Sequence, residues 1–183
     1  MVILKGTNTE KNLLEAFAGE SQARNKYSYF AAKAKDEGHD DIAAVFEETA
    51  VNEREHAKMW YKLIIGGDIQ ATADNLKTAM AGEHGEWTEM YKRMAEEARE
   101  DGFNGIAYLF ESVGKIEKEH EERFLMLLKN LEGSADTAAE EKSVWVCGNC
   151  GHIIDAENIP EKCPVCDAPR ASYNKRVINY GNG

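Results

Sequence analysis

The feature that most constrains this chain is an internal repeat of a helical hairpin. "EGHDDIAAVFEE", which begins at Glu37, resembles "DGFNGIAYLFES", which begins at Asp101, and "EREH" at Glu53 is matched by "EKEH" at Glu117. These two matches share an offset of 64 positions, whereas "AGE" at 18–20 recurs at 81–83, an offset of 63. Tandem duplication of one helix hairpin is the simplest interpretation.

Four segments with helical periodicity carry this repeat. The first follows a capping box made by Thr7 and Glu10. A glycine follows each of the first three segments, where a left-handed C-cap favours it, and no proline occurs before Pro160. The expected helices therefore cover residues 8–37, 40–65, 74–101 and 104–131.

The last quarter of the chain differs from the rest in composition and in sequence pattern. Residues 132–143 are small and acidic and are expected to form a linker. From Val144 onward there are short β-type runs, all three prolines and all four cysteines, in a segment too small to fold by burial alone. We therefore predict a mainly α protein: a four-helix bundle at 1–131, a linker at 132–143 and a small β/loop metal domain at 144–183.

Composition excludes several classes of function. The formal net charge of -11 argues against nucleic acid or an anionic membrane surface as a partner. No apolar run approaches the roughly 20 residues that a membrane-spanning helix needs, and the N-terminus lacks signal-peptide features. We expect a soluble, cytoplasmic protein, in which clustered cysteines favour metal binding over disulfides.

The repeat also aligns carboxylates and histidines. A single Glu-x-x-His pair on an acidic helix is most often solvated surface, but here each hairpin supplies one pair together with a preceding glutamate. On a four-helix bundle, six such residues predict a carboxylate-bridged dinuclear metal site, in which imidazole favours iron or manganese over calcium. The candidate ligands are Glu20, Glu53, His56, Glu83, Glu117 and His120.

One residue breaks the symmetry of this set. Glu86 follows Glu83 by three positions and shares its helix face, whereas the residue three after Glu20 is Ala23. Glu86 is either a solvated surface acid or a seventh, alternative ligand.

Other polar residues near the repeat have weaker signals. Tyr27 and Tyr91 fall at matching positions, two turns beyond the first glutamate of each hairpin. Core packing is their default interpretation, and hydrogen bonding to the metal carboxylates is the alternative. His39, His84 and His152 are expected at the surface.

Two CxxC pairs dominate the C-terminal domain. Twelve residues separate the first pair, Cys147 and Cys150, from the second, Cys163 and Cys166, a spacing typical of a tetrahedral four-thiolate site. Zinc and iron share this spacing. The details "CGNCGH" and "CPVC", together with the neighbouring helical site, favour iron.

The order AGES, EREH, AGEHGE, EKEH and CGNCG…CPVCD resembles the rubrerythrin family from end to end. The resemblance implies a ferritin-like bundle with two iron ions, followed by a rubredoxin-like domain with one iron in its four-cysteine site. It also implies that His56 and Glu86 alternate on one iron, the carboxylate when oxidised and the histidine when reduced. The implied di-iron ligands are Glu20, Glu53, Glu83, Glu86, Glu117 and His120.

The activity implied by this resemblance is reduction of hydrogen peroxide to water, a part of oxidative stress defence. Its electrons would come from NAD(P)H through rubredoxin or an NAD(P)H-dependent rubredoxin reductase. Chemistry is compatible, because two ferrous ions supply the two electrons and a tethered four-thiolate iron can reload them. A ferroxidase, an O2-activating oxygenase and a zinc-bound structural protein remain as alternatives.

The connection between the hairpins bears on assembly. A helix of about 26 residues is about 39 Å long, whereas the ten residues GGDIQATADN span at most about 35 Å. The connection is barely long enough, so two arrangements stay open: hairpins that stay within one chain, or hairpins exchanged between the subunits of a dimer. Separately, the resemblance implies a homodimer in which the cysteine module of one subunit serves the di-iron site of the other.

Overall fold

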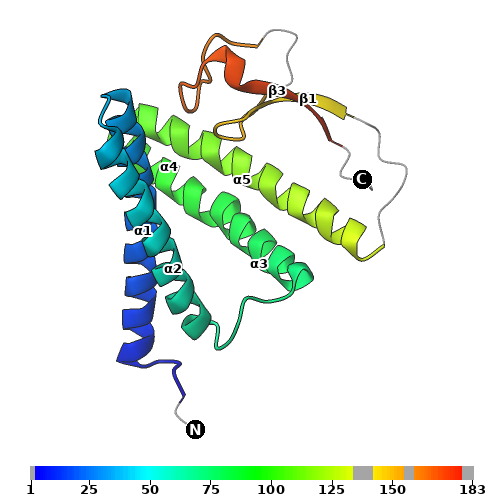
Figure 1. Cartoon of the computed structure of the whole chain (residues 1–183). Helices are drawn as coiled ribbons and strands as arrows, with labels where there is room; N and C mark the ends of the chain where they lie inside the picture. The colour runs from blue at the N-terminus through cyan, green and yellow to red at the C-terminus, as the bar shows by residue number, and fades with distance from the viewer. Residues whose placement is uncertain (1–2, 134–141, 155–158, 179–183) are drawn as a thin grey trace. The chain divides into compact units, whose positions relative to one another are not determined.

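The computed structural model describes residues 3–133, 142–154 and 159–178 (Figure 1). The chain divides into two compact units, residues 1–69 and 70–183, and each is described by itself. The first unit is a helical hairpin, and the second holds a further helical hairpin and a small sheet.

Unit 1 consists of α1 (Asn8–Asp36) packed along α2 (Asp40–Ile64). The predicted N-cap is present, because Thr7 Oγ1 accepts the Glu10 N–H at 3.1 Å, but Glu10 Oε2 accepts the Gly6 N–H at 2.6 Å in place of the Thr7 N–H of a full capping box. Gly38, between the helices, has a φ of 79°, a left-handed conformation that favours glycine. Both predicted helix boundaries are therefore confirmed to within about two residues.

Small residues bring the two helices of unit 1 together. Ala31 and Ala34 of α1 and Ala43 and Ala50 of α2 are all buried. Alanine leaves little between the backbones, so the helices approach closely along this seam. An ion pair between Lys35 Nζ and Glu47 Oε1, at 2.5 Å, joins the helices at the exposed edge.

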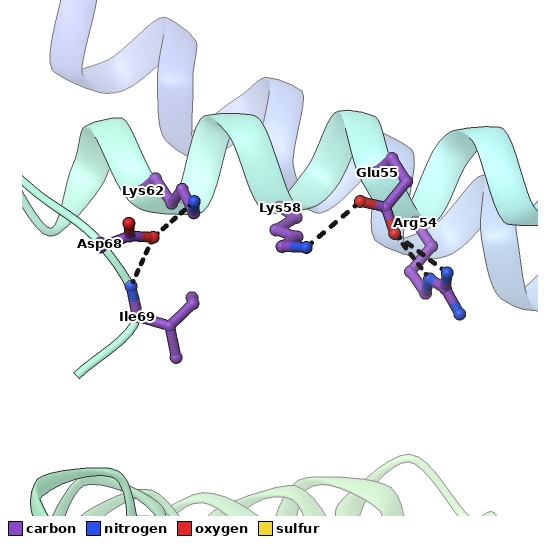
Figure 2. Close-up of polar contacts among 6 residues, drawn as sticks. All are labelled: Arg54, Glu55, Lys58, Lys62, Asp68 and Ile69. Atoms are coloured by element: carbon purple, nitrogen blue, oxygen red, sulfur yellow. Dashed lines mark hydrogen bonds and ion pairs between the residues drawn. The ribbon is translucent and has the colours of Figure 1, made fainter. Parts of the chain in front are cut away.

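The outer face of α2 is held by ion pairs along the helix (Figure 2). Arg54 and Lys58 both bind Glu55, at 3.0 and 3.3 Å. Beyond the helix, Lys62 pairs with Asp68, whose Oδ1 also accepts the Ile69 N–H at 3.2 Å. Hydrogen bonding from Lys62, then from the Ile69 backbone, lowers the pKa of Asp68. The connection that leaves unit 1 is thus tied back to the end of α2.

The helical part of unit 2 pairs α5 (Asn104–Leu131) with a long segment built of α3 (Thr72–Gly85), a π-helical turn (Glu86–Met90) and α4 (Tyr91–Glu100). Helical periodicity predicted this segment as one uninterrupted α-helix that begins at residue 74. The structure extends its start by two residues and interrupts it with the π turn. Helical periodicity assumes 3.6 residues in every turn and does not indicate a single wider turn, so the π turn was not predicted.

The seam of unit 2 repeats that of unit 1 at an offset of 64. Ala95, Ala98 and Ala107 are buried at the positions of the first three alanines of unit 1, and Gly114 replaces the fourth. The edge ion pair recurs between Arg99 Nη2 and Glu111 Oε1, at 2.5 Å. The duplication inferred from sequence is therefore also a duplication of packing.

The C-terminal part of unit 2 is a three-stranded antiparallel sheet of order β2-β1-β3. Its strands are β1 (Lys142–Cys147), β2 (Ile153–Ile154) and β3 (Tyr173–Ile178), with a 3₁₀ turn at Arg170–Ser172. Cys147, Cys163 and Tyr173 form its buried core. Two of these three residues are candidate metal ligands, so the core and the metal site coincide. Across the described parts of the chain, no helix is both long and apolar enough to cross a membrane.

Candidate metal centres

The first hairpin brings Glu20, Glu53 and His56 together. Their potential ligand atoms all lie within 4.8 Å of one another. His56 Nδ1 is 2.8 Å from Glu53 Oε2 and 3.8 Å from Glu20 Oε2. Glu53 and His56 lie one helical turn apart on α2, and Glu20 faces them from α1, so the hairpin itself positions all three.

The second hairpin repeats this triad with Glu83, Glu117 and His120. His120 Nδ1 is 2.7 Å from Glu117 Oε2 and 3.9 Å from Glu83 Oε2, nearly the distances of the first triad. The three potential ligand atoms again lie within 4.8 Å of one another. Each hairpin therefore offers two carboxylates and one imidazole, half of the set that a dinuclear site needs.

Electrostatics show that the second triad favours a cation. Burial, followed by repulsion from Glu117, raises the pKa of Glu83 to about 7. Burial also raises the pKa of Glu117, against the lowering effect of its hydrogen bond with Glu83, and the negative charge of Glu86 adds to the rise. Glu83 and Glu117 share a side-chain hydrogen bond, so one proton serves the pair. A bound cation would replace that proton and remove the repulsion, which fits these residues to a metal site.

The histidine of this triad is suited to bind metal as a neutral ligand. Burial lowers the pKa of His120, and the neighbouring Arg123 and Arg176 lower it further against the opposing effect of Glu83. A low pKa keeps the imidazole free of a proton that would compete with a metal ion. Its Nδ1 faces the carboxylates, which leaves Nε2 on the outer side of the ring.

Glu86, the carboxylate that has no counterpart in the first hairpin, lies beside the second triad. It is half-buried, and its charge raises the pKa of Glu83, Glu117 and Tyr91. The surface interpretation therefore does not describe its surroundings. Its role as an exchangeable ligand stays a prediction.

The two tyrosines at matching positions pack against aromatic rings. Tyr27 contacts Phe46 and Tyr91 contacts Phe110, each pair with ring centroids 6.1 Å apart. Burial raises the pKa of Tyr91, and the negative charge of Glu117 adds to this rise. Both tyrosines thus pack against aromatic side chains. Tyr91 also lies close enough to the carboxylates for their charges to raise its pKa.

The four cysteines form a single cluster in the C-terminal module. Their Sγ atoms all lie within 4.8 Å of one another. Cys147 and Cys166 are 3.8 Å apart, and Cys150 and Cys163 are 3.6 Å apart. A tetrahedral ion with metal–sulfur bonds of about 2.3 Å separates its sulfurs by about 3.8 Å. The cluster therefore has the dimensions of a four-thiolate metal site.

The two halves of this cluster have the same backbone structure. Gly151 N–H donates to the Cys147 C=O at 2.8 Å, and Asp167 N–H donates to the Cys163 C=O at 2.9 Å. Both donors have positive φ, 81° for Gly151 and 57° for Asp167. The same turn therefore follows the first cysteine of each CxxC pair.

Hydrogen bonding to sulfur lowers the pKa of the Cys163 thiol. Burial raises the pKa of its thiol, but hydrogen bonds from the Tyr173 hydroxyl and the backbone N–H groups of Cys166 and Val165 outweigh burial. The pKa of Cys163 falls to about 6 as a result. Asn149 Nδ2 also donates to Cys166 Sγ at 3.3 Å. Tyr173 and Asn149 were missed in the sequence, because neither has ligand chemistry of its own.

The remaining histidines follow the surface expectation only in part. His39 and His84 are exposed, but His84 Nδ1 lies 3.0 Å from Glu121 Oε1. His152 corrects the expectation: it is half-buried, with Nδ1 3.3 Å from the Tyr173 hydroxyl. His152 follows a CxxC pair in a small module, where the contact with Tyr173 partly buries its side chain.

Comparison with known proteins decides the family. The model of the family described as "Rubrerythrin" matches residues 11–128, and that described as "Rubrerythrin, rubredoxin-like domain" matches residues 145–174. The chain belongs to the rubrerythrin family. Rubrerythrin of Porphyromonas gingivalis is 44% identical over 97% of this chain and 94% of its own. Rubrerythrin of Nitratidesulfovibrio vulgaris is also 44% identical, over 98% of this chain and all of its own length (100%).

A solved structure of nigerythrin in its fully reduced, all-ferrous state is 29% identical over 96% of this chain and 92% of that one, with a TM-score of 0.42. Rubrerythrin membership confirms the predicted fold class, a mainly α ferritin-like protein followed by a small rubredoxin-like domain. It also confirms the cofactors, two iron ions held by carboxylates and histidines and one in the four-cysteine site. Family and clusters together support an oxidoreductase that detoxifies peroxide.

Proposed function

We propose that this protein is a non-haem di-iron peroxidase of the cytoplasm that reduces hydrogen peroxide to water. The proposal rests chiefly on one observation: each hairpin carries the same triad of two carboxylates and one imidazole, in a chain that also carries a four-thiolate cluster. The four cysteines form no disulfide among themselves and lie together as potential metal ligands.

The proposed di-iron ligands are the two triads and Glu86. Glu20, Glu53 and Glu117 act as permanent ligands together with Glu83 and His120. His56 and Glu86 serve one iron in alternation, the imidazole in the reduced state and the carboxylate in the oxidised state. Bound iron supplies two electrons for cleavage of the O–O bond. The reaction balances as one hydrogen peroxide, two electrons and two protons giving two water molecules.

The proposed electron route enters through the four-thiolate iron, with Cys147, Cys150, Cys163 and Cys166 as ligands. Support comes from a contact inside unit 2. A Cβ on Gly151, next to Cys150, would lie 3.2 Å from His120 Nε2 and 3.1 Å from Ile116 Cγ2. The loop that holds a cysteine is thus packed against a histidine of the helical triad. Electrons would reach the four-thiolate iron from NAD(P)H, through rubredoxin or an NAD(P)H-dependent rubredoxin reductase.

We further propose a homodimer in which the hairpins are exchanged. Helix α2 has 25 residues, a length of about 37 Å. It ends at Ile64 and α3 begins at Thr72, so the eight steps between them span at most about 29 Å. In a ferritin-like bundle this connection must return along the helix, and it is too short to do so. The earlier start of α3 makes the connection shorter than the sequence led us to expect.

Mixed dimers test the exchange. One chain carries Glu53→Ala in its first hairpin, and a second chain carries Glu117→Ala in its second. In an exchanged dimer of these two chains, one of the two sites receives only unaltered hairpins and regains activity. Without exchange, every site keeps an altered hairpin and the mixture stays inactive. The control pairs Glu20→Ala with Glu53→Ala chains, which leaves an alteration in every site under both arrangements.

The activity itself is tested by the choice of oxidant. Diferrous protein is mixed with peroxide or with O2, and oxidation of the di-iron site is followed in each case. The proposal expects faster reaction with peroxide; faster reaction with O2 would favour a ferroxidase. Protein with zinc in the four-cysteine site is the matched control, because it should complete a single turnover but fail to cycle with an external reductant.

A further inference from the structure

The two hairpins differ by one residue at a single place. Glu20 and Glu83 are offset by 63 positions, but Tyr27 and Tyr91 and every later matched pair are offset by 64. One residue is therefore added between Glu83 and Tyr91. The π turn, Glu86–Met90, lies in that interval, whereas α1 is α-helical throughout Asn8–Asp36. A π turn holds one residue more than an α turn, so it absorbs the addition locally.

Packing on both sides of the turn is unchanged by the addition. Upstream, Glu83 lies 3.9 Å from the histidine of its triad, compared with 3.8 Å for Glu20. Downstream, Tyr27 and Tyr91 contact their phenylalanines at the same centroid distance of 6.1 Å. The second hairpin thus keeps the contacts of the first before and after the turn, and the turn itself is the difference.

A compensating change lies opposite on α5. Gly114 occupies the position of Ala50, a buried residue of the first hairpin. A Cβ on Gly114 would lie 3.2 Å from Tyr91 Cβ, tighter than ordinary van der Waals contact. Alanine fits this seam where the facing helix is regular, and glycine stands where the facing helix carries the π turn.

The turn connects this contact to the carboxylate that lacks a counterpart. Tyr91 N–H donates to the Glu86 C=O, five residues earlier, the hydrogen bond that defines a π turn. The backbone of Glu86 is therefore hydrogen-bonded to that of Tyr91, and the Tyr91 side chain packs against Gly114. Glu86 itself is half-buried and lies in electrostatic reach of Glu83 and Glu117.

We propose that the π turn is a one-residue insertion into the second hairpin and that Gly114, by admitting Tyr91, positions the Glu86 carboxylate at the dinuclear site. Gly114 and Tyr91 are positioning residues that act through the turn. The inference rests on the proposed role of Glu86 as a ligand. It is tested by stability and by iron potential, neither of which involves peroxide, so its failure is distinguishable from failure of the proposed activity.

The first test removes the insertion from the full chain by deletion of Glu89, an exposed residue of the turn. Gly114→Ala is then made in the parent and in the deletion variant. We expect Gly114→Ala to lower Tm by several degrees in the parent and to have little effect after the deletion, where the facing helix is regular. Gly105→Ala, also on α5 but with open space around it, is the control and should behave alike in both. Equal effects of Gly114→Ala in the two backgrounds would overturn the proposal.

The second test measures the position of Glu86 through the iron. Because a carboxylate stabilises ferric over ferrous iron, Glu86→Ala should raise the midpoint potential of the di-iron site in the parent. After deletion of Glu89, the same substitution should lose most of this upward shift. A shift of equal size in both backgrounds would show that the turn does not position Glu86, and no shift in the parent would show that Glu86 is no ligand.

A complementary variant covers failure of the deletion variant to fold. One alanine is inserted after Ala23 in α1, which gives the first hairpin the length of the second. The proposal expects this insertion to be destabilising alone and to be rescued in part by Ala50→Gly, the counterpart of Gly114. Absence of rescue contradicts the compensation argument.

Discussion

His120 Nε2 lies 3.2 Å from the point where a Cβ on Gly151 would stand. The opposite nitrogen of the same ring, Nδ1, lies 2.7 Å from Glu117 Oε2. One imidazole therefore has a metal-site carboxylate on one side and the loop of the cysteine cluster on the other. The absence of a side chain at residue 151 allows this approach, in which the histidine links the two candidate centres of unit 2.

Gly151→Ala should disturb this approach. The added methyl group meets His120 Nε2 and Ile116 Cγ2, so the loop must move away from α5. We expect slower electron transfer from the four-thiolate iron to the di-iron site, measured by stopped-flow absorbance. Alanine at the positive φ of Gly151 (81°) also strains the backbone by about 1 kcal/mol. Gly133→Ala is the matched control, because Gly133 has a φ of 70° and open space around it. Equal transfer rates in the two variants would contradict the route.

Glu86→Ala should retain iron but slow turnover. Glu83 and the two Glu-x-x-His pairs remain to hold both ions, and Ala23 already occupies the matching place in the first hairpin. Iron content and peroxide turnover are measured together. Glu89→Ala, an exposed carboxylate of the same turn, is the control and should leave both unchanged. Loss of all di-iron from Glu86→Ala would make Glu86 an ordinary structural ligand.

The metal-free protein should become less stable as the pH rises. The pKa of Glu83 is raised from 4.5 to about 7 in the folded state. The folded state therefore holds this proton more tightly, and the free energy of unfolding falls as the pH rises from 4.5 to about 7. Between pH 5 and 8 we expect the Tm of the metal-free protein to fall by a few degrees relative to Glu83→Gln.

Subtraction of the Glu83→Gln profile isolates this residue, because glutamine does not titrate. The His120 contribution changes between the two proteins in the same direction, because loss of the Glu83 charge lowers the pKa of His120 further and removes stability at low pH. Parallel profiles for the two proteins would show that Glu83 does not carry the raised pKa. The same deprotonation should strengthen iron binding as the pH rises through 7.

Cys163→Ser should remove the four-thiolate iron and unfold only the small module. Cys163 is fully buried in a core made largely of the ligands themselves, and domains of this size depend on their metal for folding. The red colour of oxidised four-thiolate iron should disappear, while the helical circular dichroism and its melting stay near those of the parent. Simultaneous loss of the helical signal would show that the module supports the hairpins.

Duplication gave each residue of the helical triads an independent second occurrence in the sequence, and the structure brings the members of each triad together. Glu53 with His56 is ambiguous alone, and its recurrence as Glu117 with His120 made the interpretation specific. Cysteine spacing worked for a similar reason, since two knuckles specify four ligands together. The structure adds that each triad is assembled within one hairpin.

What the sequence could not supply depends on contacts between segments. The shift in offset from 63 to 64 was visible in the sequence, but only the structure shows that a π turn absorbs it. The replacement of Ala50 by Gly114 has no meaning until Tyr91 is seen against it. The hydrogen bond from Tyr173 to a thiolate likewise depends on strand pairing in a sheet with few residues.

The central claim is two-electron reduction of peroxide by the di-iron site, and an anaerobic titration tests it most directly. Fully reduced protein receives hydrogen peroxide in small additions, while the absorbance of both iron centres and the remaining peroxide are measured. The account predicts that one equivalent of peroxide oxidises one diferrous site without O2 release. Further peroxide then oxidises the ferrous four-thiolate iron, which supplies additional electrons. Peroxide that persists beside unchanged ferrous iron, or that disproportionates to O2, would contradict it.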